Sequence, residues 1–141
     1  MRSLDDILEE YEFLEGDERY RLLIELGREL EEMPAALKTD ATLVRGCSAS
    51  VWVYPTGAEE SSPGSGKLHF LADSNAAITK GIVALVIAAV QDRPAAEVAA
   101  MDVMAALSPF DLKNQLSSNR TQCVPNMIAL VREHAARLAQ A

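Results

Sequence analysis

Cysteine is scarce in this 141-residue chain, which contains only Cys47 and Cys123. Two cysteines are too few for a disulfide framework, and they fall short of the three or four ligands that a zinc or iron–sulfur site needs. The two histidines, His69 and His134, lie far apart in the sequence and are expected to be packing or surface residues. We therefore expect no bound metal and no bound cofactor, and a metal or cluster scaffold stays a weaker alternative.

An excess of basic residues and long hydrophobic runs are also missing. The formal net charge is −8, so the basic patch that nucleic-acid binding requires is absent. The longest uncharged apolar run, residues 81–90, is too short to span a bilayer, which takes about 20 residues. The first residues do not form a charged-then-apolar leader. We expect a cytoplasmic protein with no nucleic-acid and no membrane partner.

The acidic residues are concentrated at the N-terminus. Residues 1–32 contain 12 acidic and 4 basic residues, whereas residues 33–141 contain 9 of each. Two interpretations stay open: the segment is a solvated face that aids solubility, or it steers a basic protein partner.

The N-terminal half predicts a helical hairpin followed by a small sheet. Ser3, followed three residues later by Asp6, indicates a helix start. Apolar residues at helical spacing then predict two helices, which are separated at Gly16-Asp17 and end before Pro34. Residues 42–44, 50–54 and 67–72 predict a two- to three-stranded antiparallel sheet, and residues 55–66 a mobile connection.

The C-terminal half predicts a buried helix and several flanking helices. Asp73-Ser74 is expected to cap a helix over residues 75–90, which is apolar nearly all round and therefore buried against the sheet. Short helices are expected over 94–100 and 103–107, with a turn over 110–116. The last helix runs to about Leu138 and begins either at 117–119 or at Pro125. We expect residues 1–141 to form a single α+β domain, in which a small antiparallel sheet packs against a buried core helix and flanking helices.

Cys47 lies in an unusual local setting. Arg45-Gly46 precede it, Ser48 follows it, and a strand-like run with the only tryptophan, Trp52, comes next. This pattern favours a loop in which a thiolate, the attacking species, can be reached. Gly46 permits a positive φ and leaves room for a partner chain. The residues alone leave open whether Cys47 is a reactive nucleophile or an inert filler at the start of a strand.

Four groups of residues, in order along nearly the whole chain, resemble the SufE family (SufE, CsdE). They are Arg19-Tyr20 with 23–27; Val44-Arg45-Gly46-Cys47 with 50–52; Asp73-Ser74 with 76–78 and 80–81; and Leu116-Ser117, Asn119-Arg120 and Met127-Ile128. Members of this family are sulfur acceptors that act with cysteine desulfurases in iron–sulfur cluster assembly.

The resemblance implies a fold related to that of the iron–sulfur scaffold proteins, and it implies a site. Cys47 is then the acceptor of persulfide sulfur, tucked toward an apolar pocket at rest. Arg120 is expected near the cysteine, where it stabilises the thiolate or persulfide; alternatively it pairs with an acid such as Asp73 or Glu25. Asp73 is the acid expected to support the tip beside the loop.

The resemblance also implies the partners. A desulfurase similar to SufS or CsdA, whose own pyridoxal phosphate generates the persulfide, donates sulfur to this chain and is stimulated by it. An iron–sulfur scaffold or another recipient takes the sulfur onward. The chain is then a covalent sulfur-transfer protein and desulfurase activator, with no stand-alone turnover.

Cys123 departs from the family pattern, which usually has glycine at this position. Cys123 is either a small buried replacement or a partner of Cys47 that forms a reversible disulfide or resolves its persulfide. A bridge requires Cα atoms within roughly 7 Å. A thiol redox protein that uses Cys47 and Cys123, and a non-catalytic adaptor, stay open as alternative functions.

Overall fold

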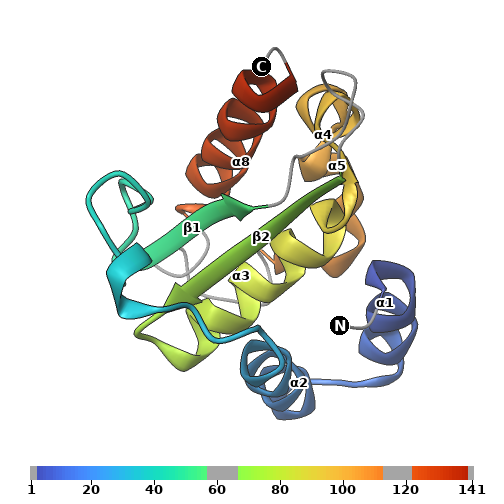
Figure 1. Cartoon of the computed structure of the whole chain (residues 1–141). Helices are drawn as coiled ribbons and strands as arrows, with labels where there is room; N and C mark the ends of the chain where they lie inside the picture. The colour runs from blue at the N-terminus through green and yellow to red at the C-terminus, as the bar shows by residue number, and fades with distance from the viewer. Residues whose placement is uncertain (1–2, 57–66, 113–121, 140–141) are drawn as a thin grey trace.

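The computed structural model describes residues 3–56, 67–112 and 122–139 (Figure 1). Three strands form one antiparallel sheet of order β1-β2-β3, and the other elements are helical. In chain order the elements are α1 (Leu4–Phe13), α2 (Asp17–Arg28), η1 (Ala35–Leu37), β1 (Val51–Thr56), β2 (Lys67–Ser74), α3 (Ala77–Val90), β3 (Arg93–Pro94), α4 (Ala95–Ala100), α5 (Val103–Leu107), η2 (Ser108–Phe110) and α8 (Val124–Ala139).

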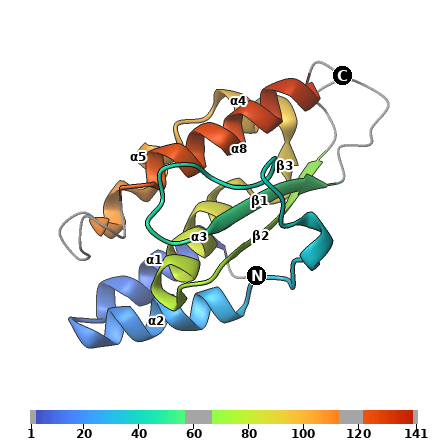
Figure 2. The ribbon, with the colours of Figure 1, turned by 90° about the vertical axis from the view of Figure 1, so that its left-hand side faces the viewer.

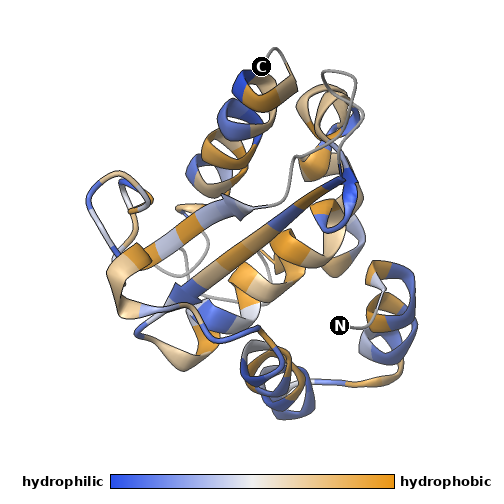
Figure 3. Ribbon diagram, viewed as in Figure 1, coloured by the Kyte–Doolittle hydropathy of each residue, from blue (hydrophilic) through white to orange (hydrophobic). Residues whose placement is uncertain are grey.

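Helix α3 is the centre of the core, as its sequence predicts. Ten of its fourteen residues are buried, and Figure 3 shows it in orange along most of its length. Its closest neighbour is α2, because glycines let the two backbones approach: a Cβ at Gly81 would collide with the backbone oxygen of Leu23. The predicted buried core helix is confirmed.

Alternate residues of β1 and β2 face opposite sides of the sheet. Val51 pairs with Ser74 at one end of the ladder, and Thr56 pairs with His69 at the other. The buried set on the inner face comprises Val51, Val53, Leu68, Phe70, Ala72 and Ser74. Trp52 and Asp73, which pair with each other, are only half-buried on the outer face.

The sheet and α3 lie between two groups of helices. Helices α1 and α2 lie on one side, and α8 and α4, which pack against each other, lie on the other (Figure 2). Ser3 caps α1 as predicted, because its Oγ accepts a hydrogen bond from the backbone N–H of Asp6 at 3.2 Å. The α+β class is therefore confirmed.

The third strand differs from the prediction. Residues 42–44 do not form a strand; Leu43 makes only an isolated bridge to Trp52, because the chain turns away directly after it. The third strand is instead β3, which pairs with Lys67 and Leu68 at the other edge of β2. A two-residue strand carries no periodicity that its sequence could display.

Two helix boundaries also differ. Asp73 and Ser74 end β2 and do not form the predicted cap, because α3 starts only at Ala77; Ser74 still accepts a hydrogen bond from the Ala76 N–H at 3.3 Å. Helix α2 ends at Arg28, whereas the sequence suggested a helix up to Pro34. Helix α8 begins at Val124, so Pro125 occupies its first turn. Strand β1 includes Pro55 and Thr56, which the sequence assigned to the connection over 55–66. Residues 57–66 of that connection, and residues 113–116 of the turn expected over 110–116, lie outside the described residues.

Candidate functional site

The cysteine loop, which we define as residues 44–50, joins an isolated bridge to the start of β1. Its base is closed by a hydrogen bond from the Val44 N–H to the Val51 carbonyl at 2.8 Å. Gly46 has a φ of 82°, which confirms the positive φ expected from the sequence. Cys47 is half-buried and packs against the core, whereas Arg45 and Ser48 on either side are exposed.

Cys47 is joined to Cys123 in a disulfide. The two residues are 76 positions apart in the sequence, and their Cα atoms are 4.8 Å apart, within the range that a bridge requires. Cys123 is buried in the core with 1% of its surface exposed, and it directly precedes α8. Both ideas about Cys123 therefore hold in part: it is a small buried residue, and it also lies in bonding distance of Cys47.

Two asparagines hold the cysteine loop from outside. Asn126 in the first turn of α8 donates from Nδ2 to the carbonyl oxygen of Arg45 at 2.9 Å. A Cβ at Gly46 would lie only 2.5 Å from that Nδ2, so Asn126 occupies the space that the sequence suggested for a partner chain. At the other end, Ser50 and Asn75 exchange two hydrogen bonds, from the Ser50 N–H to Asn75 Oδ1 at 3.1 Å and from the Asn75 N–H to the Ser50 carbonyl at 3.3 Å.

Asp73 is paired with two lysines on the outer face of the sheet. Its carboxylate lies 2.6 Å from Lys38 Nζ and 3.1 Å from Lys80 Nζ, and it accepts from the Ser74 N–H at 2.8 Å. Burial alone would raise the pKa of Asp73, but the hydrogen bonds from Lys38, Lys80 and Ser74 outweigh it and lower the pKa. Lys38 also lies over the Trp52 ring, 5.4 Å from its centroid.

These contacts show what Asp73 does in the fold. It ties the end of β2 to the segment around Lys38 and to the first turns of α3, next to the strand that leaves the cysteine loop. Arg120, the third residue expected at the site, lies outside the described residues. The sequence reasoning did not single out Lys38 or Asn126, because neither carries a local pattern; their partners are 35 and 81 positions away.

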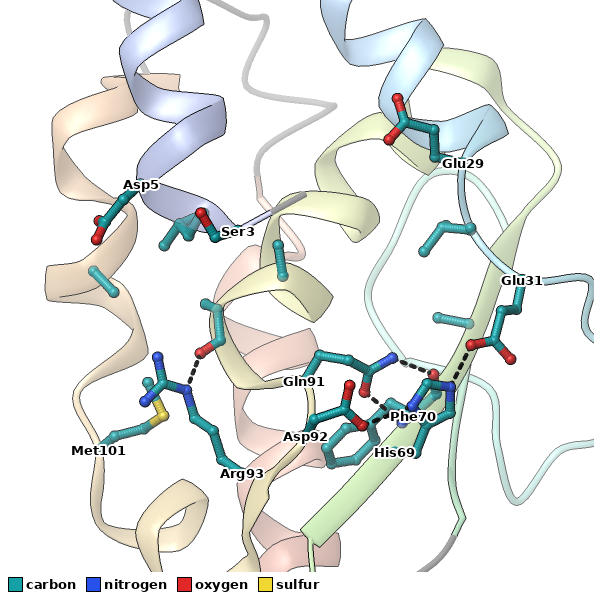
Figure 4. A pocket seen from close by; sticks show the side chains of 16 residues that line it. Ser3, Asp5, Glu29, Glu31, His69, Phe70, Gln91, Asp92, Arg93 and Met101 are labelled. Atoms are coloured by element: carbon teal, nitrogen blue, oxygen red, sulfur yellow. Dashed lines mark hydrogen bonds and ion pairs between the residues drawn. The ribbon is translucent and has the colours of Figure 1, made fainter. Parts of the chain in front are cut away.

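A separate pocket of about 660 Å³ lies between the N-terminus of α1, the end of α2 and the far end of the sheet (Figure 4). Its most polar part is the histidine cluster, which we define as His69, Glu31 and Asp92. His69 Nδ1 lies 2.9 Å from Asp92 Oδ1, and Nε2 lies 2.5 Å from Glu31 Oε1. The hydrogen bond to Asp92 raises the pKa of His69, and the one to Glu31 adds to this effect, although burial opposes it.

A side chain that lines the pocket also satisfies the backbone hydrogen-bonding groups at the edge of β2. The side-chain amide of Gln91 accepts from the Phe70 N–H at 2.7 Å and donates to the Phe70 carbonyl at 3.0 Å (Figure 4).

None of Cys47, Asp73 and Cys123 lines this pocket. Within the described ranges, no three His, Cys, Asp or Glu side chains are arranged to hold a metal ion; this includes the histidine cluster, where each carboxylate is hydrogen-bonded to a ring nitrogen. Across those same ranges, no helix has the length and apolar character needed to cross a membrane.

Comparison with known proteins identifies relatives over most of the chain. The family model SufE, described as an Fe-S metabolism associated domain, matches residues 5–135. An uncharacterized SufE-like protein of Rhizobium etli is 37% identical over 137 residues, which are 96% of this chain and 90% of that protein. The sulfur acceptor protein CsdE of Escherichia coli is 38% identical over 106 residues, covering 75% of this chain and 69% of CsdE.

A solved structure shares the fold. The solution structure of a hypothetical protein from Thermus thermophilus superimposes with a TM-score of 0.74, covering 98% of this chain and 96% of that one. The identity between the two sequences is 14%, so the likeness bears on the arrangement of elements alone.

Proposed function

Because the chain belongs to the SufE family, we propose that it is a sulfur acceptor, which takes persulfide sulfur from a cysteine desulfurase onto Cys47. The observation that carries the proposal is the similarity to the sulfur acceptor CsdE. The position of Cys47 supports it, because the residue lies in a loop whose neighbouring side chains reach the surface.

The proposed step is a thiol exchange at sulfur. The Cys47 thiolate attacks the outer sulfur of the desulfurase persulfide, a new bond forms between Cys47 Sγ and that sulfur, and the desulfurase thiolate leaves. The pyridoxal phosphate belongs to the desulfurase, and this chain contributes the acceptor thiol. Only the reduced form can react, because in the disulfide Cys47 Sγ is bonded to Cys123 Sγ.

Delivery requires the loop to present Cys47 to a second protein. In the structure Cys47 packs toward the core and Asn126 holds the loop against α8, so we infer that desulfurase binding displaces the Asn126 hydrogen bond and turns the loop outward. We further propose that Arg120 stabilises the thiolate or persulfide, that Asp73 supports the neighbouring strand end, and that an iron–sulfur scaffold or another recipient takes the sulfur. Binding would also stimulate the desulfurase.

The test is sulfur loading from labelled cysteine. The protein is reduced, freed of reductant and mixed under argon with a cysteine desulfurase and labelled cysteine, and the label is located by peptide mass. We expect one sulfur atom on the peptide that contains Cys47, and none in Cys47→Ser although this variant still binds the desulfurase. Equal loading of Cys47→Ser, or label on another residue, would refute the proposal.

A second candidate is a thiol redox protein that uses Cys47 and Cys123, and the disulfide is the observation that favours it. This function predicts rapid turnover of a peroxide when a dithiol reductant restores the pair. If peroxide is consumed no faster than by Cys47→Ser, this candidate is excluded.

A further inference from the structure

We propose that Cys123 is a resolving cysteine, which attacks the Cys47 persulfide and releases the bound sulfur as hydrosulfide. The inference rests on the proposed function and extends it: the chain then delivers reduced sulfide in addition to persulfide sulfur. The starting observation is the disulfide between Cys47, the proposed acceptor, and Cys123.

The burial of the two cysteines differs and assigns them different roles. Cys47 is half-buried in a loop with exposed neighbours, so a partner protein can reach it after a small loop movement. Cys123 is 1% exposed and lies behind it, in the core. An external persulfide therefore cannot reach Cys123 directly, and the reactive group available to Cys123 is whatever Cys47 carries.

The proximity of the two cysteines does not depend on the disulfide alone. Asn126, three residues after Cys123, holds the loop through its hydrogen bond to the Arg45 carbonyl, and Asn75 holds the other end of the loop at Ser50. These bonds are made by neutral amides that do not involve either sulfur, so reducing the disulfide does not itself break them. The reduced thiols thus stay close together, and their reaction is intramolecular, which raises its rate greatly over that with a free thiol.

The position of Cys123 also suits an attacking thiolate. It directly precedes α8, and its carbonyl oxygen accepts the helical hydrogen bond from the Met127 N–H at 2.9 Å. The N-terminal end of a helix carries partial positive charge and stabilises an anion. Together with the bond to Cys47, this location places the Cys123 sulfur at the positive end of a helix and next to the sulfur that it would attack.

The step balances without an external oxidant. The Cys123 thiolate attacks Cys47 Sγ, the bond between Cys47 Sγ and the outer sulfur breaks, and hydrosulfide leaves with the electron pair. The two cysteine sulfurs lose two electrons in forming the disulfide, and the outer sulfur gains two in becoming sulfide. The proton released when Cys123 ionises goes to solvent. A dithiol reductant then restores both thiols and makes the chain ready for another sulfur atom.

The experiment follows one round of loading in the full chain. Reduced parent protein and Cys123→Ala are mixed under argon with a desulfurase and less than one equivalent of labelled cysteine, without other thiols. Intact mass and trapped hydrosulfide are recorded over time. In the parent we expect a transient species with one added sulfur, then the disulfide form lacking two hydrogens, with one hydrosulfide per loaded chain. In Cys123→Ala we expect the persulfide to persist and hydrosulfide release to slow by at least about tenfold.

The controls separate this inference from the function on which it rests. If both proteins are loaded and release hydrosulfide at the same rate, the resolving role is overturned while the acceptor role stands. Label on the Cys123 peptide of the parent would also overturn it, because Cys123 would then have attacked the outer sulfur. If neither protein is loaded, both proposals fail. Cys123→Ser, a closer match in size, is measured in parallel, and both variants are checked for native circular dichroism and unfolding under reducing conditions.

Discussion

The cysteine loop and the histidine cluster lie at opposite ends of the β1–β2 ladder and are held by different interactions. The loop is fixed by a disulfide and by the neutral amides of Asn75 and Asn126. The cluster is fixed by a titratable ring between the two carboxylates of Glu31 and Asp92. The first region should therefore respond to reductant and the second to pH, so one small sheet carries two independent sensitivities.

Loss of the disulfide should have the largest effect on stability. A bridge between residues 76 positions apart restricts the unfolded chain strongly. We therefore expect Cys47→Ser, which cannot form the bridge, to lose about 3 kcal/mol of unfolding free energy relative to the oxidised parent. Urea denaturation measures the difference. With dithiothreitol present, the parent should fall to the level of the variant. If the parent still has the higher unfolding free energy under reducing conditions, Cys47 stabilises the fold through packing and not through the disulfide.

Gly46→Ala should loosen the loop without touching either cysteine. The new Cβ needs a positive φ and would collide with Asn126 Nδ2, so we expect a loss of about 2 kcal/mol and slower re-formation of the disulfide after reduction. Thiol titration over time gives the rate. Gly16→Ala is the matched control, because Gly16 also has a positive φ but its Cβ would meet nothing within 4 Å and lies outside the loop. Equal slowing in both variants would attribute the effect to general destabilisation.

Away from both regions, acid should destabilise the fold through His134 in α8. Arg137 donates to His134 Nδ1 at 2.8 Å, so the neutral ring carries its proton on Nε2, which is buried without a partner among the described residues. Burial and the nearby Arg137 charge lower the pKa of His134. The folded state thus disfavours protonation, and stability should fall by up to about 1 kcal/mol as pH drops from 7.5 to 5.5.

Replacing His134 tests whether this residue causes the loss of stability at low pH. In His134→Gln, which keeps an acceptor for Arg137, that acid-dependent loss should disappear. Denaturant unfolding at several pH values gives the slope. A variant as acid-sensitive as the parent over this range would place the titrating group elsewhere.

Replacing His69 in the histidine cluster should have the smallest effect on stability, and its pH dependence should be opposite to that of His134. The pKa of His69 is raised in the fold, so its pairing contributes stability that is full below about pH 6.5 and is lost as pH rises through the folded pKa. Since Glu31 and Asp92 are mostly exposed, we expect His69→Gln to cost only about 0.5 kcal/mol at pH 5.5 and close to nothing at pH 8.5. A larger cost at pH 8.5 would show that the ring acts through packing.

Local patterns allowed much of the fold to be predicted. The apolar residues of α3 and the cap at Ser3 each depend on a few adjacent residues, so the sequence alone indicated them. Strand β3 could not be found this way, because two residues have no periodicity and their pairing with Lys67 and Leu68 spans 27 and 25 positions. The resemblance to the SufE family, which the comparisons confirm, also indicated the α+β fold class.

The candidate site was predictable in its chemistry and only partly in its geometry. The polar residues around Cys47 predicted a loop, and Gly46 predicted a positive φ there. The departure at Cys123 raised the disulfide as one of two interpretations, but the distance between the cysteines depends on how α8 packs against β1. The role of Asn126 could not be predicted, because its hydrogen bond to Arg45 bridges 81 positions. The role of Arg120 stays a prediction.

The paired hydrogen bonds of Gln91 have a consequence for solubility. An uncovered strand edge offers its backbone groups to strands of other molecules, which is a route to aggregation. By satisfying both the N–H and the carbonyl of Phe70, the Gln91 amide shields this edge of β2 just where the short β3 no longer pairs with it. A single side chain thereby discourages edge-to-edge association between copies of this protein.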